Sequence, residues 1–312
     1  MQYYDGLKML GLRVVNEELK GNIEGKVHAL LAGTAGEQRL EEIFNKYTLP
    51  FPYKVLFNVN LTSHAYFQID CLLVSPKFLL VLESKNISGQ LSFDENPDWL
   101  IRVRENGTVD VFESPEVQVA RNKWLLQEWL IARGYDIPVF GAIVWTTGSL
   151  PNMIKSPKST QSLFVKSVPT FVLKVWESYE RVALHDTELS SLIAMIKHES
   201  KRAMYVPFPI APRWNIRSTE LLFGIRCLQC NRIGMTRYHR GWICNRCDNY
   251  DKEAHKVAIQ EWFVLLKETM TNRECREFLQ IDDRYLAKRL LKSCDVIEIG
   301  TTKGTVYKWN WK

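Results

Sequence analysis

No apolar run in this chain of 312 residues reaches the roughly eighteen residues that span a bilayer, so the sequence predicts no membrane segment. Internal repeats are also lacking, which excludes a repeat array, and the sequence has no low-complexity tail. The seven cysteines are an odd number, and no signal peptide precedes them. Both observations argue against a disulfide framework and predict a cytoplasmic protein. The hydrophobic share of 46% is ample for the cores of two or three domains.

Two predicted strands carry charged side chains near their ends. The strands cover residues 67–74 and 78–84, and the short turn between them predicts a hairpin. Glu83 and Lys85 are two residues apart and therefore project to the same face, while Asp70 ends a similar apolar run. Two carboxylates suit Mg²⁺ or Mn²⁺. A lysine beside them can orient a water or offset negative charge on a phosphate.

An E-x-K spacing is also common on exposed strands, where it is simply a solvated face. Its position here favours a metal site, because residues 78–82 are a continuous apolar run, as in a strand buried on both faces. Charges at the end of such a strand need partners or a metal ion.

With these motifs, residues from about 33 to 147 resemble the nuclease-related domain (NERD), a branch of the PD-(D/E)xK, restriction-endonuclease-like superfamily. The resemblance rests on blocks that follow one another in this order: Gly36-Glu37 ahead of a helix at 38–46, a strand at 55–59, Gln68-Ile69-Asp70, Leu82-Glu83-Ser84-Lys85-Asn86, Glu113-Ser114-Pro115-Glu116-Val117-Gln118 ahead of a helix, and a late apolar strand at 139–147. Ser114, where an Asn is frequent, and Phe78, where a Gly is usual, depart from the family pattern.

The resemblance implies an α/β fold in which helices flank a mixed sheet. It also implies a catalytic site of Glu37, Asp70, Glu83, Lys85 and Gln118, in which Asp70 and Glu83 hold the Mg²⁺ or Mn²⁺. Without the resemblance, Glu37 would be an acid favoured by the dipole at a helix start, and Gln118 a surface residue one step off an apolar stripe. Within it, the amide of Gln118 would position the lysine or the attacking water.

The helix that carries Gln118 has a predicted start. Ser114 is a suitable N-cap and Pro115 suits the first turn, so we expect a helix over residues 115–133.

Four cysteines form two C-x-x-C pairs with thirteen residues between them: Cys227, Cys230, Cys244 and Cys247. This spacing predicts a zinc ribbon, in which each pair makes a knuckle and the two knuckles complete a tetrahedron. Two disulfides or a redox dithiol are the alternatives. The surrounding thirty residues are too few for a sizeable core, which favours a structural Zn²⁺.

Positive charge gathers around these cysteines. Residues 201–250 contain nine basic and two acidic residues, whereas the whole chain is only +6. Arginine pairs with phosphate in a fork and stacks on bases, so the patch predicts nucleic-acid binding. Its candidate contacts are Arg226, Arg232, Arg237, Arg240 and Arg246. The alternative is a patch that contacts an acidic surface elsewhere in the protein.

The last sixty residues predict a winged helix-turn-helix. Three helices are expected, at 254–270, 272–279 and 284–293, followed by a hairpin of strands 296–299 and 306–309. The third helix would enter the major groove. The candidate contacts are Arg284, Lys288, Arg289 and Lys292, with Lys303 on the wing. Many winged helices instead bind protein or dimerise.

We therefore expect five segments: an N-terminal helical segment at 1–28, the nuclease domain at 29–150, a helical extension and Pro-rich linker at 151–220, the ribbon at 221–250 and the winged helix at 251–312. The expected function is metal-dependent hydrolysis of double- or single-stranded DNA. A non-cutting DNA-binding regulator and an RNA-processing nuclease remain alternatives. A homodimer or a further protein partner also stays open.

Overall fold

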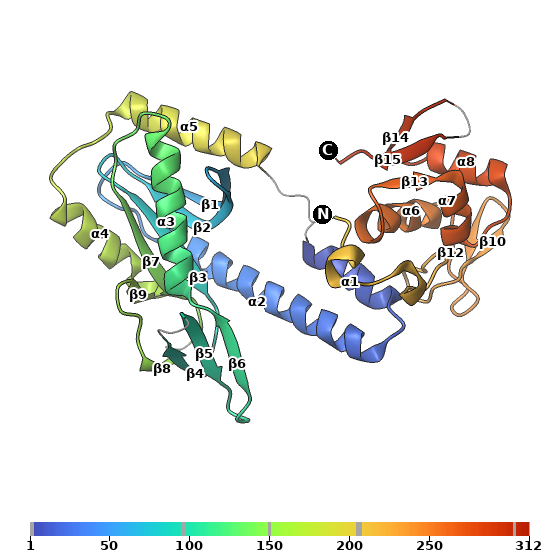
Figure 1. Ribbon diagram of the computed structural model, residues 1–312, viewed down its shortest axis with the longest axis horizontal. Coiled ribbons are helices and arrows are strands. Elements are labelled where there is room, and N and C mark those ends of the chain that lie inside the picture. The colour runs from blue at the N-terminus through green and yellow to red at the C-terminus, as the bar shows by residue number, and fades with distance from the viewer. Residues whose placement is uncertain (1–2, 95–97, 149–150, 204–207, 302–303, 312) are drawn as a thin grey trace. The chain divides into compact units, whose positions relative to one another are not determined.

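The computed structural model describes residues 3–94, 98–148, 151–203, 208–301 and 304–311 (Figure 1). The chain divides into two compact units. One unit comprises Leu31–Tyr205, and the other combines Met1–Leu30 with Val206–Lys312. Among the described residues, no helix has the length and apolar character needed to cross a membrane.

A five-stranded mixed sheet forms the centre of the unit Leu31–Tyr205, with the strand order β1-β2-β3-β7-β9. Its strands are β1 (Lys54–Thr62), β2 (Tyr66–Val74), β3 (Leu79–Lys85), β7 (Val139–Trp145) and β9 (Gln161–Phe164). The first three are antiparallel, and β3, β7 and β9 are parallel. Val74 pairs with Leu79, which confirms the predicted hairpin.

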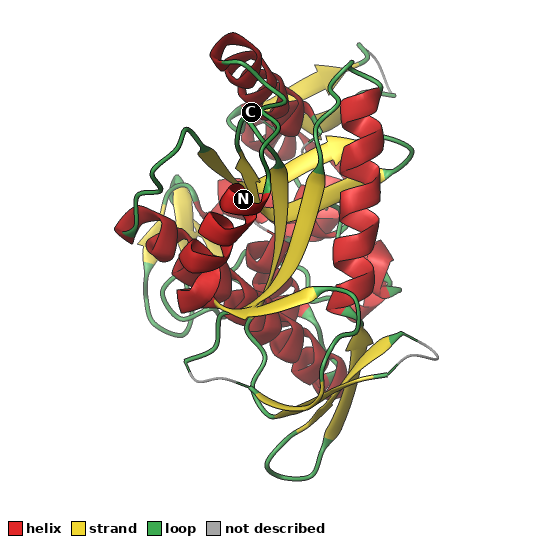
Figure 2. Cartoon of the chain, turned by 90° about the vertical axis from the view of Figure 1, so that its left-hand side faces the viewer, coloured by secondary structure: helices red, strands yellow, loops and turns green. Residues whose placement is uncertain are grey.

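Helices cover both faces of this sheet (Figure 2). On one face, α3 (Pro115–Ile131) and α5 (Asp186–Arg202) share a core with Leu79 and Val81. On the other face, α2 (Glu17–Lys46) and α4 (Val168–Ser178) share a core with the alternate residues of β3, Leu80 and Leu82. The continuous apolar run of β3 is thus a strand buried on both sides, as its sequence predicted. The predicted start of α3 is confirmed by the Ser114 side chain, which accepts from the Glu116 backbone N–H.

A smaller sheet lies in the same unit, with the strand order β6-β5-β4-β8. Its strands are β4 (Gln90–Phe93), β5 (Trp99–Val103), β6 (Val109–Glu113) and β8 (Asn152–Lys155). The strands β8 and β9 and the short helix η1 (Val165–Ser167) begin the segment that was expected to be helical. Strand β8 pairs with β4, and its Met153 packs against Leu91 and Trp145. These contacts join residues far apart in the sequence, so the local sequence does not predict the strand.

The helix that carries Glu37 is longer than expected. We expected it to begin at residue 38, but α2 begins at Glu17, which places Glu37 in its interior. Gly36 is not a helix start but a point of close approach. A Cβ at this position would lie 2.5 Å from Thr146 Oγ1 and 3.0 Å from Asn86 Cβ. The glycine therefore lets α2 pack against the ends of β3 and β7.

The second unit has one continuous core, which joins α1 (Tyr3–Arg13) with the C-terminal elements. These are η2 (Ala211–Trp214), η3 (Ser218–Glu220), β10 (Thr236–Tyr238), β11 (Gly241–Ile243), β12 (Tyr250–Asp251), α6 (Ala254–Leu265), β13 (Thr269–Thr271), α7 (Asn272–Leu279), α8 (Arg284–Lys292), β14 (Val296–Ile299) and β15 (Val306–Trp309). The strands form two three-stranded sheets, β10-β11-β12 and β13-β15-β14.

Local signals in this unit match the structure closely. Thr271 and Glu274 form a capping box at the start of α7, and the Asp283 carboxylate caps α8. The pairing of β14 with β15 confirms the predicted hairpin. Helix α6 ends at Leu265 rather than at residue 270, because Met270 instead lies in β13 and pairs with Tyr307.

A buried ion network joins α1, α6 and the first cysteine knuckle. Glu261 is fully buried and accepts from Arg13 Nη2 at 2.5 Å and from Arg226 Nη2 at 2.6 Å. Arg13 also donates to the backbone oxygens of Leu222 and Gly224. Every charge in the network thus has a partner, which is the condition for tolerating buried charge.

Replacing Gly36 by Ala should destabilise the protein by about 1–3 kcal/mol, because the new methyl group overlaps Thr146 in a packed contact. Gly33 lies one turn earlier in α2 with nothing within 4 Å of its would-be Cβ. Gly33→Ala should therefore be neutral or stabilising by up to ~1 kcal/mol. Urea unfolding of both variants tests this, and equal effects would contradict the close approach.

The stability of the second unit should fall as the medium becomes acidic. Burial, with Lys256 and Arg237 nearby, lowers the pKa of His255 to about 4. The imidazole accepts from Trp242 Nε1 at 3.3 Å, and its other nitrogen lies 3.0 Å from Ser293 Oγ. Because the unfolded state takes up a proton near pH ~6.5 and the folded state resists it, stability is full above that pH and declines below it. Thermal unfolding between pH 7.5 and 5 should show this decline, and His255→Gln should weaken it.

Candidate active site and metal centre

The site begins at a local break in two neighbouring strands. Phe57 pairs with Cys71 and Val59 with Ile69, but no pairing joins the residues between them, Asn58 and Asp70. Asn58 has a left-handed backbone with φ of 52°. Asparagine tolerates this conformation better than most residues.

The break shifts the side-chain alternation of β2. Ile69 packs with α3 on one face, whereas Cys71, two residues on, packs on the opposite face. In an unbroken strand, residues two apart share a face. Asp70 was expected to end an apolar run, but it lies in the middle of β2, where the shift occurs. Its carboxylate turns toward the end of β3: Oδ2 accepts from the backbone N–H of Ser84 at 3.0 Å and from the Ser84 hydroxyl at 3.1 Å.

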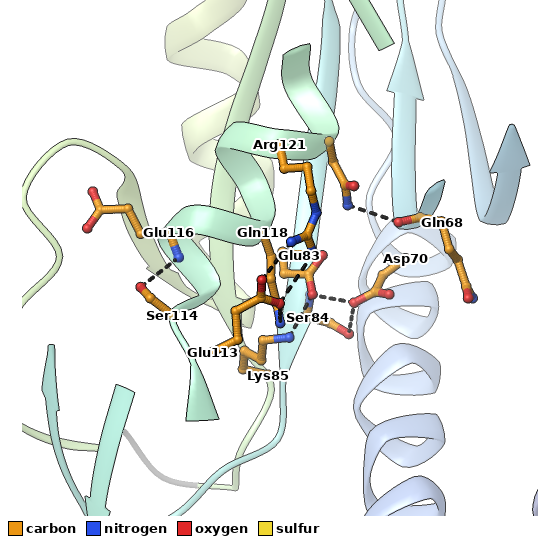
Figure 3. A network of polar contacts seen from close by, with 11 residues as sticks. Gln68, Asp70, Glu83, Ser84, Lys85, Glu113, Ser114, Glu116, Gln118 and Arg121 are labelled. Atoms are coloured by element: carbon orange, nitrogen blue, oxygen red, sulfur yellow. Dashed lines mark hydrogen bonds and ion pairs between the residues drawn. The ribbon is translucent and has the colours of Figure 1, made fainter. Parts of the chain in front are cut away.

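Glu83 and Lys85 lie at the end of β3, between Asp70 on one side and residues of α3 on the other (Figure 3). Glu83 is only 7% exposed, and its Oε1 accepts from Lys85 Nζ at 2.6 Å. Burial, then the nearby charge of Asp70, raises the pKa of Glu83, while Lys85 opposes the rise. Charges shift the pKa of a carboxyl group in this way only at short range, so Asp70 and Lys85 are both neighbours of Glu83.

Glu37 approaches the same region from α2. Its Oε2 accepts from Asn58 Nδ2 at 3.1 Å, so the residue at the strand break also orients this carboxylate. Burial raises the pKa of Glu37, and the charge of Asp70 adds to the rise. Asn58 in turn accepts from Gln68 Nε2 at 3.1 Å.

The start of α3 supplies the other side of the site. Gln118 Nε2 donates to Glu113 at 2.9 Å, and Arg121 Nη1 donates to the same carboxylate at 2.6 Å (Figure 3). These bonds lower the pKa of Glu113, with Arg121 as the largest cause. The Oε1 of Gln118 is buried and finds no hydrogen-bond partner within the described part of the chain. A buried acceptor left in this state is available to a donor that enters the site.

The structure thus brings Glu83 and Lys85 into direct contact, and Asp70 lies near enough for its charge to act on Glu83. Glu37 is hydrogen-bonded to Asn58, and Gln118 to Glu113. Sequence reasoning missed Asn58, Ser84, Glu113 and Arg121. Glu113 lies in one of the sequence blocks shared with the nuclease-related domain. Arg121 follows Gln118 at a spacing of three, which places Gln118 and Arg121 next to each other on one surface of the helix. For Asn58 the only available signal was a turn-type residue inside an apolar strand.

The carboxylates suit a hard divalent cation by their chemistry. Their oxygens are not gathered as a preformed cage, however. Of the residues that the structure describes, only the four cysteines form a group of three or more His, Cys, Asp or Glu donors within 4.8 Å of one another. The Glu83 carboxylate is paired with Lys85, so a cation that binds Glu83 would have to displace the lysine from it.

The candidate arginines of the ribbon differ in their surroundings. Arg232, Arg237, Arg240 and Arg246 are exposed. The guanidinium of Arg237 lies over the Trp242 ring, 5.1 Å from its centroid. Arg226 differs, because it donates to Glu261 and Asn231 inside the unit. Its nitrogens are committed to internal bonds, which favours a structural role for this one residue.

The candidate contacts on α8 share one exposed face. Ala287, Leu290 and Leu291 face the core, whereas the basic residues are exposed. They are Arg284, Lys288, Arg289 and Lys292. Lys292 lies 3.5 Å from Glu298 of β14. Lys303, the candidate contact on the wing, lies outside the described residues.

The four cysteines converge as a metal centre. Their Sγ atoms lie within 4.8 Å of one another, and Cys227–Cys247 and Cys230–Cys244 are each 3.6 Å apart. Tetrahedral zinc with bonds of about 2.3 Å requires sulfur atoms about 3.8 Å apart. All four thiols are free of disulfides, so this donor set fits Zn²⁺.

The two knuckles are built alike. In the first, Asn231 N donates to Cys227 O at 2.8 Å, and in the second, Asp248 N donates to Cys244 O at 3.0 Å. Asn231 and Asp248, which each follow the second cysteine of a pair, both have left-handed backbones. This repeated geometry orients each pair of thiols toward one point. Four thiolates leave no open position, so the ion would be structural.

Removal of the metal should unfold the ribbon. We expect purified protein to contain about one zinc ion per chain, and Cys244→Ser to lose it together with thermal stability. Cys294→Ser is the matched control, because Cys294 is partly buried in the same unit but lies outside the four-thiol group. Elemental analysis and thermal unfolding measure both effects. Equal metal content in the two variants would rule out the four-cysteine centre.

One known family matches part of the chain. Residues 32–146 match the family model described as the nuclease-related domain, NERD. No curated protein and no solved structure matches the chain. The matched segment contains β1, β2, β3, α3 and β7, and with them all five of the predicted catalytic positions. The chain therefore carries a nuclease-related domain over residues 32–146.

Proposed function

We propose that this protein is a Mg²⁺- or Mn²⁺-dependent hydrolase of DNA phosphodiester bonds. The observation that carries the proposal is the meeting of Asp70, Glu83 and Lys85 at the end of the buried strand β3, inside the nuclease-related domain. Lys85 is a partner for the buried Glu83, but the second carboxylate of Asp70 raises the free energy of the charged pair, and a divalent cation would offset this repulsion.

In this proposal, Asp70 and Glu83 hold the divalent cation, and Glu37 assists through a water. The bound ion would act as a Lewis acid toward the scissile phosphate and lower the pKa of a bound water. Lys85 has two candidate roles, which are to stabilise the extra negative charge on the phosphate or to take a proton from the attacking water. Gln118 would position that water or the lysine with its buried amide oxygen.

The second unit would hold the nucleic acid. The exposed arginines of the ribbon would bind phosphates and stack on bases. The element order α6-β13-α7-α8-β14-β15 fits a winged helix-turn-helix, in which the basic face of α8 would contact the DNA. These features support DNA as the substrate, although the ribbon aromatics are also compatible with RNA.

Substitution of Lys85 by Ala should reduce cleavage by ~100-fold or more while leaving the fold intact, since loss of one charge-stabilising group at a reacting centre has an effect of this size. The assay compares supercoiled plasmid, linear duplex, single-stranded DNA and RNA, with Mg²⁺, Mn²⁺ or EDTA. Lys174→Ala, an exposed lysine of α4, is the control. Binding without cleavage under every metal would instead support a DNA-binding protein that does not cut.

Mn²⁺ affinity should fall in acid as Glu83 becomes protonated. Burial and Asp70 raise the pKa of Glu83, and Lys85 opposes the rise only in part. The loss of Mn²⁺ affinity should therefore occur at a higher pH than the ordinary pKa of a glutamate would give. Lys85→Met removes the lowering effect and should move the midpoint to higher pH. Isothermal titration with Mn²⁺ between pH 5 and 8 measures the midpoint in both proteins. An unchanged midpoint would separate Glu83 from the metal site.

A further inference from the structure

We propose that the surface where the β1–β2 hairpin meets α3 stacks an unpaired base, so that the site takes a nucleic-acid strand with single-stranded character next to the cleaved bond. This surface consists of His64, Tyr66, Gln68, Arg121 and Trp124. The inference rests on the proposed nuclease function and names the substrate class of that same site.

Trp124 is the central residue of this surface. It lies on α3 but away from its core-facing side, which is formed by Leu125, Leu126 and Trp129. The side chain is 55% exposed, so more than half of its surface is open to solvent. An exposed indole offers a flat apolar face on which a base can stack.

The hairpin between β1 and β2 places a second ring beside it. The His64 ring is nearly parallel to the Trp124 indole, with an interplanar angle of 11° and centroids 5.7 Å apart. His64 Nε2 also lies 3.4 Å from Glu128 Oε2, one turn further along α3. These contacts fix the hairpin against the helix. The result is a pair of exposed, parallel rings whose orientation is already set, which suits stacking at low cost in conformational entropy.

The same surface is joined to the catalytic residues by two routes. Tyr66 donates to Asn60, Asn60 Nδ2 donates to the backbone oxygen of Asn58, and the Asn58 side chain donates to Glu37. On the other side, Asn122 of α3 donates to the backbone oxygen of Gln68 at 2.9 Å, two residues before Asp70. These bonds connect the hairpin and α3, which carry the rings, to Glu37 and to the strand that carries Asp70.

Charge near the ring is compatible with a nucleic-acid strand. Arg121 lies one helical turn from Trp124 on α3, is exposed, and forms an ion pair with Glu113 at 2.6 Å. A phosphate between the site and the ring would compete with Glu113 for this guanidinium, while Glu128 on the far side of Trp124 would repel further phosphates. The arrangement fits one base on the rings and its phosphate directed toward Lys85. In a duplex, bases are covered by their neighbours, so a free base face requires single-stranded character.

The test measures binding of the full-length protein to a single-stranded dT oligonucleotide and to a blunt duplex, in Ca²⁺ or EDTA to limit cleavage. Trp124→Ala should weaken single-strand binding by ~5- to ~150-fold, the range for loss of one base–aromatic stack, and leave duplex binding unchanged. Trp124→Phe should retain most of the affinity. Trp99→Ala is the matched control, because Trp99 is 45% exposed on β5 of the same unit.

The slope of log affinity against log salt should stay the same in Trp124→Ala, because no phosphate contact is removed. An equal loss for duplex and single strand, or the same loss in Trp99→Ala, would overturn the inference, as would unchanged binding in Trp124→Ala. The last result would also be expected if the rings dock a protein instead.

Failure of this inference can be distinguished from failure of the proposed function. If Lys85→Ala abolishes cleavage while Trp124→Ala binds single strands normally, the nuclease proposal stands and the stacking surface is wrong. If no nucleic acid is cut but Trp124→Ala selectively loses single-strand binding, the stacking surface stands without the hydrolase.

Discussion

Asp70 reaches the end of β3 because the alternation of side chains shifts by one residue where Asn58 and Asp70 face each other. Upstream of this point the apolar residues of β2 alternate in one phase, and downstream in the other. A regular strand would direct the Asp70 carboxylate into one of the two apolar cores, where an unpaired charge is strongly unfavourable. The left-handed backbone of Asn58 makes the shift, and its side chain binds Glu37. One irregularity thus positions two acids.

The burial of β3 strengthens the electrostatic interactions between the charged residues at its end. Its apolar residues lie in the cores on both faces of the sheet, and the polar residues Glu83 to Lys85 begin where those cores end. Glu83 is therefore held in a medium that strengthens its interactions with Asp70 and Lys85. Gly36 contributes by letting α2 approach this edge of the sheet.

Much of this arrangement could be predicted from local sequence. The turn between β2 and β3, the cap at Ser114 and the paired cysteine knuckles all depend on interactions within a few residues, and local signals predicted them. The length of α2 could not be predicted, because Gly36 serves a distant contact with Thr146 rather than ending a helix. Strand β8 was missed for a similar reason, since it exists through pairing with β4.

The catalytic positions illustrate the same division. Asp70, Glu83 and Lys85 could be proposed because strand periodicity and a family resemblance both pointed to them. Arg121 and Glu113 were missed because their role depends on how α3 packs against β3, which no local pattern encodes. Arg226 had the composition of a nucleic-acid contact, but the structure pairs it with Glu261, a partner 35 residues away. Charge counts alone cannot separate internal partners from external ones.

If the strand break lets Asp70 and Glu83 share one divalent cation, crystals soaked in Mn²⁺ should show the ion in their anomalous diffraction. We expect a single peak in contact with carboxylate oxygens of both Asp70 and Glu83, with Lys85 released from its bond to Glu83. A crystal that contains bound Mn²⁺ elsewhere, with no peak here and the bond between Glu83 and Lys85 intact, would contradict it.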